Sequence, residues 1–161
     1  MKRLWPFALL APLAVIAAAL WAFTNNRAVS MPTETYATRA EADAHGAFAP
    51  VPQGWLPRFI PEGATALRTA HNPGTHQSWG EFRAPSAGWA PIGLAKNQPR
   101  ELLLPGAPSV VPWWPAELRG RVASGDLEMR GYRFSILDGE KSPIVVAVRG
   151  AQVYWWRLAR Q

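Results

Sequence analysis

Residues 130–158 read RGYRFSILDGEKSPIVVAVRGAQVYWWRL, and this stretch decides the fold. In its first part, Tyr132, Phe134 and Ile136 alternate with glycine, arginine and serine. That two-residue period is typical of a strand with one buried face. The sequence therefore predicts a strand over 130–137.

Two more strands follow after short turns. Asp138-Gly139 predicts a tight turn, and the apolar run 143–148 predicts the second strand. Gly150-Ala151 predicts another turn, which leads into a third strand over 152–158. Three consecutive strands with short connections predict an antiparallel meander. Because the second strand is apolar on both faces, we expect it to lie centrally with both faces covered.

A hairpin is predicted further upstream. Residues 64–70 and 76–83 are strand candidates, and the His-Asn-Pro-Gly-Thr segment 71–75 supplies the turn. A short helix is predicted over 115–120, where a proline begins it and a glycine ends it. We therefore expect an α+β, mainly β domain over 54–161, with about five antiparallel strands and one short helix.

The amino terminus carries a basic pair and then a long apolar run. Lys2 and Arg3 precede residues 4–23, which contain no charge. A helix of that length spans the roughly 30 Å hydrocarbon core of a bilayer. The positive-inside rule places the short tail in the cytoplasm. Residues 1–30 are thus predicted to be a transmembrane signal-anchor that holds the rest of the chain in the periplasm, on the bacterial inner membrane.

A cleaved signal peptide is the alternative, because Ala28-Val29-Ser30 forms a small-x-small site. Against cleavage, the apolar run ends in bulky aromatic residues that suit a membrane interface. The chain has no cysteine, which excludes a lipid attached to cysteine after cleavage. Residues 31–53, rich in alanine and polar residues, are predicted to be a linker with at most a short helix over 34–44.

The charge balance argues against a nucleic-acid partner. The net charge is +6, but half of it comes from Lys2, Arg3 and Arg27, which flank the apolar run. A nucleic-acid-binding domain usually clusters lysine and arginine on one face. The arginines of the remaining chain are scattered, so a mildly basic surface is the preferred interpretation.

Several aromatic motifs resemble those of a known group of sequences. The motifs are Trp55-Leu56-Pro57, His71-Asn72, Trp79-Gly80-Glu81-Phe82-Arg83 and the terminal Tyr154-Trp155-Trp156-Arg157. Together they resemble a group of small uncharacterised bacterial membrane-anchored proteins, over residues 54–83 and 130–158. The resemblance implies a periplasmic domain and implies no activity.

No catalytic signature stands out in the sequence. Nucleophile elbows, phosphate-binding loops and zinc-helix motifs are absent, so the chain is predicted not to be an enzyme and to hold no cofactor or metal. The alternative is a small-ligand-binding or hydrolytic domain acting on envelope material. Its site would combine His71, His76 and Glu81, because the two histidines flank a predicted turn.

Tryptophan is the remaining peculiarity, with nine in the chain. Trp155 and Trp156 are consecutive in a predicted strand, so they must point to opposite faces. Packing of the tryptophans on two covered faces is the preferred interpretation. Exposed tryptophans beside arginines would instead suit protein recognition, glycan stacking or the membrane interface. The sequence thus predicts a protein-interaction domain of the envelope, with an immunity-type role as a special case. Its proline-rich segment 84–112 and these residues would form the contact surface: Trp89, Trp113, Trp114, Trp155 and Arg157.

Overall fold

The computed structural model describes residues 31–157 except for 51–52, 92–102, 106–110 and 138–141. The predicted anchor helix over 4–23 and the predicted turn at Asp138-Gly139 lie outside the described residues. Within the described part of the chain, no helix is long and apolar enough to cross a membrane.

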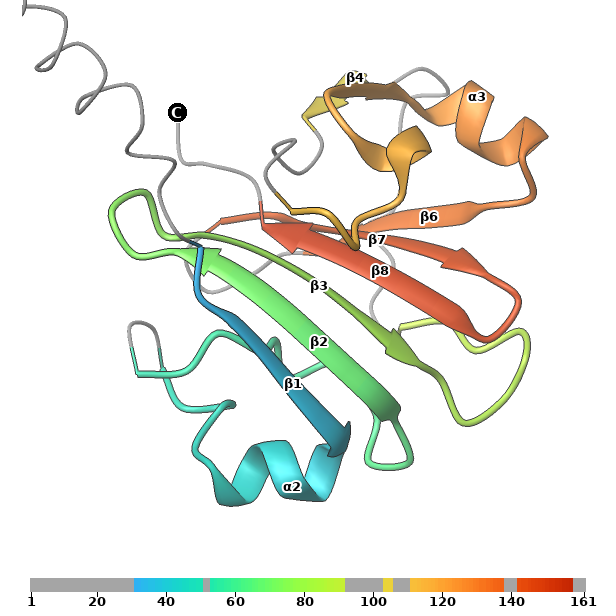
Figure 1. Cartoon of the computed structure of the whole chain (residues 1–161). Helices are drawn as coiled ribbons and strands as arrows, with labels where there is room; N and C mark the ends of the chain where they lie inside the picture. The colour runs from blue at the N-terminus through green and yellow to red at the C-terminus, as the bar shows by residue number, and fades with distance from the viewer. Residues whose placement is uncertain (1–30, 51–52, 92–102, 106–110, 138–141, 158–161) are drawn as a thin grey trace, which may run out of the picture. The chain divides into compact units, whose positions relative to one another are not determined.

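A six-stranded antiparallel sheet forms the centre of the domain (Figure 1). The predicted hairpin and the predicted meander are both confirmed, and they join through the two strands at the middle of the sheet. The strand predicted to be central lies one strand from the edge. In spatial order the strands are β1 (Thr33–Thr38), β2 (Thr65–Asn72), β3 (Gln77–Arg83), β8 (Gln152–Arg157), β7 (Ile144–Arg149) and β6 (Arg133–Leu137).

Shorter elements complete the fold. The mainly β prediction with short helices is confirmed. The helix predicted over 115–120 is a single 3-10 turn, and α2 (Arg39–Ala44) overlaps the helix predicted over 34–44. These elements are α2 (Arg39–Ala44), η1 (Ala116–Leu118), α3 (Ser124–Met129) and the paired strands β4 (Leu103–Pro105) and β5 (Arg121–Ala123).

The linker predicted over 31–53 is wrong, because this segment supplies β1 and α2. β1 pairs antiparallel with β2 and places Glu34 opposite Thr69. The compact unit therefore begins at Met31 and not at the predicted Gly54. The physical reason is that the β-branched threonines of β1 favour extended backbone, and the edge of β2 offers them a partner.

The helix predicted over 34–44 begins only after β1 ends. Thr38 Oγ1 accepts a hydrogen bond from the Glu41 N–H at 3.2 Å. The Glu41 carboxylate in turn accepts one from the Ala37 N–H at 2.7 Å. This reciprocal arrangement satisfies amides that the first turn of a helix leaves without partners.

We expect Thr38→Ala to lower the free energy of unfolding by about 1 kcal/mol, because the Glu41 amide loses its acceptor. Urea denaturation measures this change. Thr38→Ser keeps the hydroxyl and is the matched control, which should retain most of the stability. An equal loss in both variants would show that the cap is not the cause.

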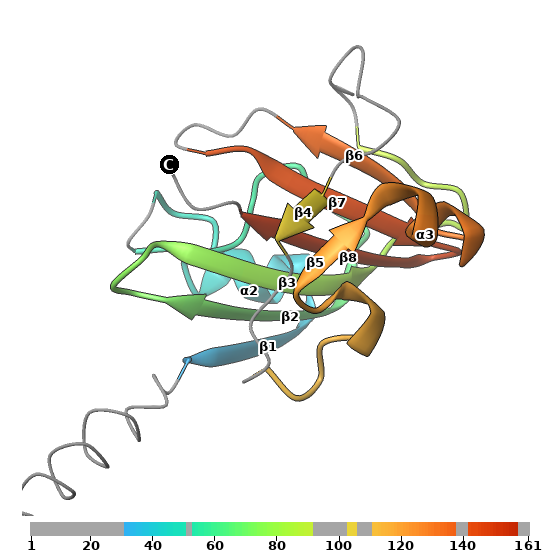
Figure 2. The ribbon, with the colours of Figure 1, turned by 90° about the horizontal axis from the view of Figure 1, so that it is seen from above.

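Both faces of the sheet are covered over its central strands. We call the face covered by α2 and residues 47–50 and 53–64 the first face, and the face covered by residues 111–132 the second face. Figures 1 and 2 show α2 and α3 on opposite sides of the sheet. β7 illustrates the result, since Val145 packs in the second-face cluster and Val146 in the first-face cluster, both with no exposed surface.

Trp155 and Trp156 point to opposite faces, as predicted. On the first face the Trp155 ring lies against Gly80, which is opposite it on β3. A Cβ atom on Gly80 would lie 2.5 Å from three atoms of that ring. The tryptophan therefore fits the sheet only because its cross-strand neighbour has no side chain.

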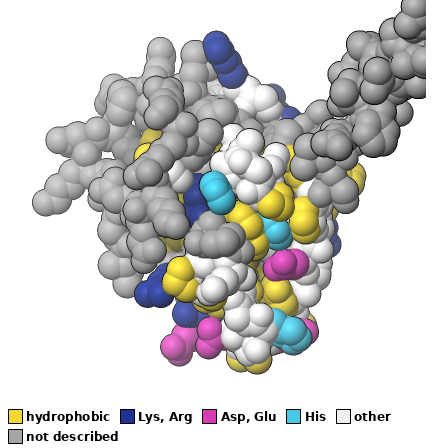
Figure 3. All heavy atoms as spheres, turned by 90° about the vertical axis from the view of Figure 1, so that its left-hand side faces the viewer, with side chains coloured by type: hydrophobic (Ala, Val, Ile, Leu, Met, Phe, Trp, Pro, Cys, Tyr) yellow, Lys and Arg dark blue, Asp and Glu magenta, His cyan; other side chains and the backbone are white. Residues whose placement is uncertain are grey.

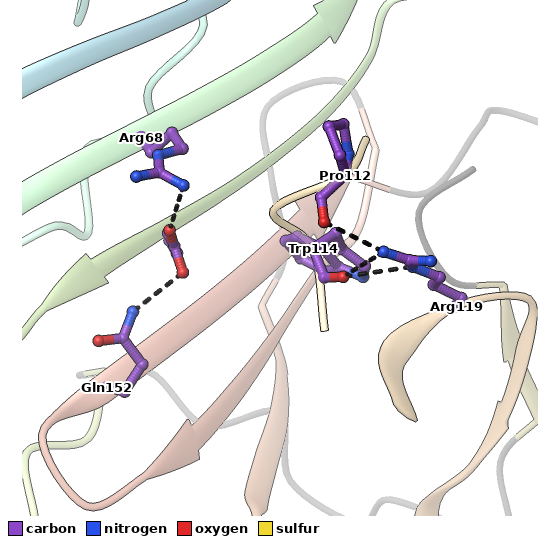
Figure 4. Close-up of polar contacts among 6 residues, drawn as sticks. Arg68, Pro112, Trp114, Arg119 and Gln152 are labelled. Carbon is purple, nitrogen blue, oxygen red and sulfur yellow. Dashed lines mark hydrogen bonds and ion pairs between the residues drawn. The ribbon is translucent and has the colours of Figure 1, made fainter. Parts of the chain in front are cut away.

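The cover of the second face is organised around Trp114. Its Nε1–H donates to the Leu118 carbonyl at 2.9 Å. The Arg119 guanidinium donates to the Trp114 carbonyl, at 2.9 Å from one nitrogen, and to the Pro112 carbonyl at 3.2 Å (Figure 4). These bonds hold the turn 112–119 together and satisfy the buried indole N–H of Trp114.

Candidate functional site

The five residues predicted to form an interaction surface do not share one. Trp114 and Trp155 are buried, with 1% and 0% of their surface exposed, so neither ring is available to a partner. Trp89 is half-buried on the first face, whereas Trp113 is half-buried on the second. Arg157 is half-buried at the end of β8. Trp114 and Trp155 instead pack between the sheet and the covers of its two faces, which agrees with the expectation that both faces are covered.

The alternative site of His71, His76 and Glu81 is only partly assembled. Both histidine rings contact Trp55, but Glu81 lies on the second face, paired with Arg68. His71 lies on the first face, because it is three residues beyond Arg68 along β2. Within the described part of the chain there is no group of three metal-ligating side chains.

Glu81 on β3 contacts residues of both neighbouring strands on the second face, and Figure 4 labels these two partners, Arg68 and Gln152. Its carboxylate lies 3.5 Å from Arg68 on β2 and accepts a hydrogen bond from Gln152 on β8 at 3.2 Å. Burial raises the pKa of Glu81, and the charge of Arg68 opposes that shift. Arg68 also lies over the Trp113 ring, 5.4 Å from its centre. The carboxylate therefore has two partners in the fold, which suits a structural role.

A second carboxylate attaches the second-face cover to the sheet. The Tyr132 hydroxyl donates to Glu117 at 2.9 Å, and Arg149 lies 3.3 Å from the same oxygen. The Arg149 guanidinium also lies over the Tyr132 ring at 4.6 Å. A backbone hydrogen bond, the Tyr132 hydroxyl and Arg149 together lower the pKa of Glu117. Glu117 is thus held as a paired carboxylate, which is unlike the protonated general acid of a hydrolase.

Half-buried aromatic side chains line the outer side of the first-face cluster. We call these four residues the aromatic band: Tyr36, Phe48, Phe59 and Trp89. Phe59 stacks on Trp89 with ring centres 6.4 Å apart. At the other end, Tyr36 lies 5.8 Å from the ring of the exposed His45.

Arg39 contacts Phe48 of the aromatic band and the residue that follows Phe59. Its guanidinium lies over the Phe48 ring at 4.9 Å and donates to the carbonyl of Ile60, the residue after Phe59. The band combines aromatic rings with an arginine, which are the side chains that protein interfaces favour. Of the four residues of the band, only Trp89 was predicted to belong to an interaction surface. Tyr36 and Phe48 are the two aromatic residues of the segment predicted to be a linker. Large aromatic side chains are unusual in a flexible linker, and this was the sequence signal that could have identified them.

A histidine stack adjoins the band. The Trp55 ring lies parallel to the His71 ring, at 4.0 Å and 10°. The exposed His76 ring lies 6.4 Å from Trp55. Burial lowers the pKa of His71, and the negative charge of Glu34 opposes the shift. On the side of the domain drawn at left in Figure 1, histidine side chains lie among hydrophobic ones (Figure 3).

The residues of the aromatic band and of the histidine stack, apart from Trp89, lie in the amino-terminal half of the domain. Comparison of the whole chain with curated proteins and with solved structures gives no match. The family model described as the YbbD head domain matches residues 31–83. The matched range takes in β1 and α2 as well as the β2–β3 hairpin. Residues 31–83 are thus similar to a YbbD head domain, which supports the resemblance to a small uncharacterised bacterial family.

Proposed function

We propose that this chain is a single-pass protein of the bacterial inner membrane whose periplasmic domain is a non-enzymatic protein-interaction module. The aromatic band carries the proposal. Its four rings are half-buried, so each keeps contact area for a partner while packing against the first-face cluster fixes its position. Rings held in this way lose little conformational entropy on binding.

The surroundings of the band fit a protein partner. Arg39 has its guanidinium over Phe48, and arginine and aromatic side chains are enriched among the residues that dominate binding energies. Exposed His45 and Arg58 flank the band and add polar groups at its rim. An apolar centre with a polar rim is the usual anatomy of a protein interface.

The non-enzymatic part of the proposal is supported by what the carboxylates do. Glu81 and Glu117 each contact an arginine and a second polar side chain within the fold. A general acid or base must instead reach a substrate in a cleft. Of the residues considered for a hydrolytic site, Glu81 lies on the face opposite His71.

Membrane attachment is supported by the sequence alone. The uncharged run 4–23 is long enough to span a bilayer, and the basic residues Lys2 and Arg3 orient it with the amino terminus in the cytoplasm. Intact-mass measurement of the membrane-extracted protein tests retention of this run. A chain that begins at Met31 would show that the segment is cleaved.

Photo-crosslinking in intact envelopes tests the interaction. A crosslinking amino acid in place of exposed His45 or Arg58 is expected to give the same partner from both positions. The control is the same amino acid in place of Met129, which is 81% exposed at the end of α3. Products that also form from position 129, or only uncrosslinked chain from positions 45 and 58, would contradict the proposal.

A further inference from the structure

Residues 54–60, which we call the clip, cover part of the first face. The Trp55 and Leu56 amides both donate to the Ala47 carbonyl at 3.0 Å. Leu56 and Ile60 enter the first-face cluster, and Trp55 is 5% exposed. Between them lies Phe59 of the aromatic band, so the position of the band depends on the clip.

The Trp55 ring reaches β2 by its stack on His71. His71 is 6% exposed, and its Nδ1 atom is buried without a hydrogen-bond partner among the described residues. Ser78, opposite His71 on β3, has a buried hydroxyl that likewise lacks a protein partner. A neutral imidazole can present an unprotonated nitrogen at such a position. An imidazolium would place an N–H donor there, and no described residue accepts a hydrogen bond from it in this arrangement, which is costly in a buried site.

Charged and titratable groups approach His71 from three other elements. Glu34 on β1 favours the imidazolium, and the π face of Trp55 does so as well. His76, from the hairpin turn, contacts the same tryptophan. Arg157 on β8 follows Trp156, which is opposite Trp79, so the register places it beside Ser78. Burial is the largest influence on the pKa of His71 and lowers it.

We propose that protonation of His71 releases the clip from the first face, so that acidification of the solution disassembles the aromatic band. The release rests on the stack and the buried Nδ1 atom. Its effect on partner binding rests on the proposed function. The domain is thereby a pH-dependent binding module whose partner is held near neutral pH and freed in acid.

The pH range follows from the direction of the shift. Because the pKa of His71 is lower in the folded state, its contribution to stability is complete above the unfolded value of about 6.5. The contribution is lost as the pH falls toward the folded value. Over that interval the equilibrium for release changes by at most about tenfold for each pH unit.

Amide hydrogen exchange on the full-length protein, corrected for intrinsic pH effects, tests the release. Protection of the Trp55 and Leu56 amides is expected to fall between about pH 7 and 5 by up to tenfold per unit. The Val146 amide in β7 serves as the internal reference and should stay protected. Unchanged clip protection across this range would overturn the proposal.

Two variants distinguish the effect of protonating His71 from that of protonating His76. His71→Phe keeps a ring for the stack and cannot be protonated, so clip protection should become independent of pH. His76→Asn removes the other ring that contacts Trp55, and it should retain the wild-type pH response. A pH response that survives His71→Phe, or disappears in His76→Asn, would refute the assignment to His71.

The wild-type protein alone gives an independent test if a variant does not fold. Nuclear magnetic resonance should show the His71 ring titrating below the ordinary histidine range, with clip exchange following the same midpoint. Titration in the ordinary range would overturn the proposal. An absence of crosslinks from position 58 at neutral pH would instead refute the proposed function. Failure of the pH switch and failure of the proposed function therefore give different results.

Discussion

Gly54→Ala is expected to destabilise the domain by about 3 kcal/mol. A Cβ atom at this position would lie 2.5 Å from the backbone nitrogen and oxygen of Ala49 and 2.6 Å from the Ala47 oxygen. These are main-chain atoms, so no side-chain rotation relieves the overlap. The Ala47 carbonyl also accepts the amides of Trp55 and Leu56, so relieving the clash displaces the start of the clip.

Urea denaturation measures the effect, and Gly125→Ala is the matched control. Gly125 lies in α3, and a Cβ atom there has no neighbour within 4 Å. Alanine should raise the stability at this position by roughly 0.5–1 kcal/mol, because glycine is unfavourable within a helix. If both variants changed stability by the same small amount, the packing described at Gly54 would be incorrect.

Gly80→Ala is expected to cost about 2–3 kcal/mol, because the new methyl group meets the Trp155 ring. Trp155 is fully buried and cannot turn away. A β-strand otherwise accepts alanine readily, so a loss of this size would be specific to the contact. Circular dichroism during urea unfolding gives the free energy.

A double-mutant cycle with Trp155→Leu isolates the contact between the two residues. Leucine has no ring atoms at the positions nearest to Gly80, so the double variant should be more stable than the sum of the single losses predicts, by roughly 1–3 kcal/mol. Additive losses would show that the overlap between the methyl group and the ring is not responsible.

The carboxy-terminal meander was predictable because its pattern is local. Strand period, turn residues and the opposed Trp155 and Trp156 are all set by positions within a few residues of each other. β1 was missed because only Tyr36 among its residues is large and apolar. Its place at the sheet edge depends on pairing with β2, and α2 and the clip separate the two strands in the sequence.

The candidate site was less predictable, since its contacts join distant segments. The sequence indicates that His71 and His76 flank a turn. The ring that contacts both histidines is that of Trp55, which lies in the clip and is distant from them in the sequence. Burial of Trp114 and Trp155 requires covers on both faces, and neither cover has a repeating apolar pattern. Phe48 could not be assigned to a surface while its segment was interpreted as a linker.

Hydroxyl-radical footprinting of Phe59, Trp89 and Met129 tests the proposed interaction most directly. The full-length protein is labelled in native membranes and again after reconstitution into vesicles of lipid alone. We predict that oxidation of Phe59 and Trp89 is several-fold lower in native membranes, while oxidation of the 81% exposed Met129 is the same in both. Equal oxidation of the band in the two preparations would contradict a protein partner at this surface.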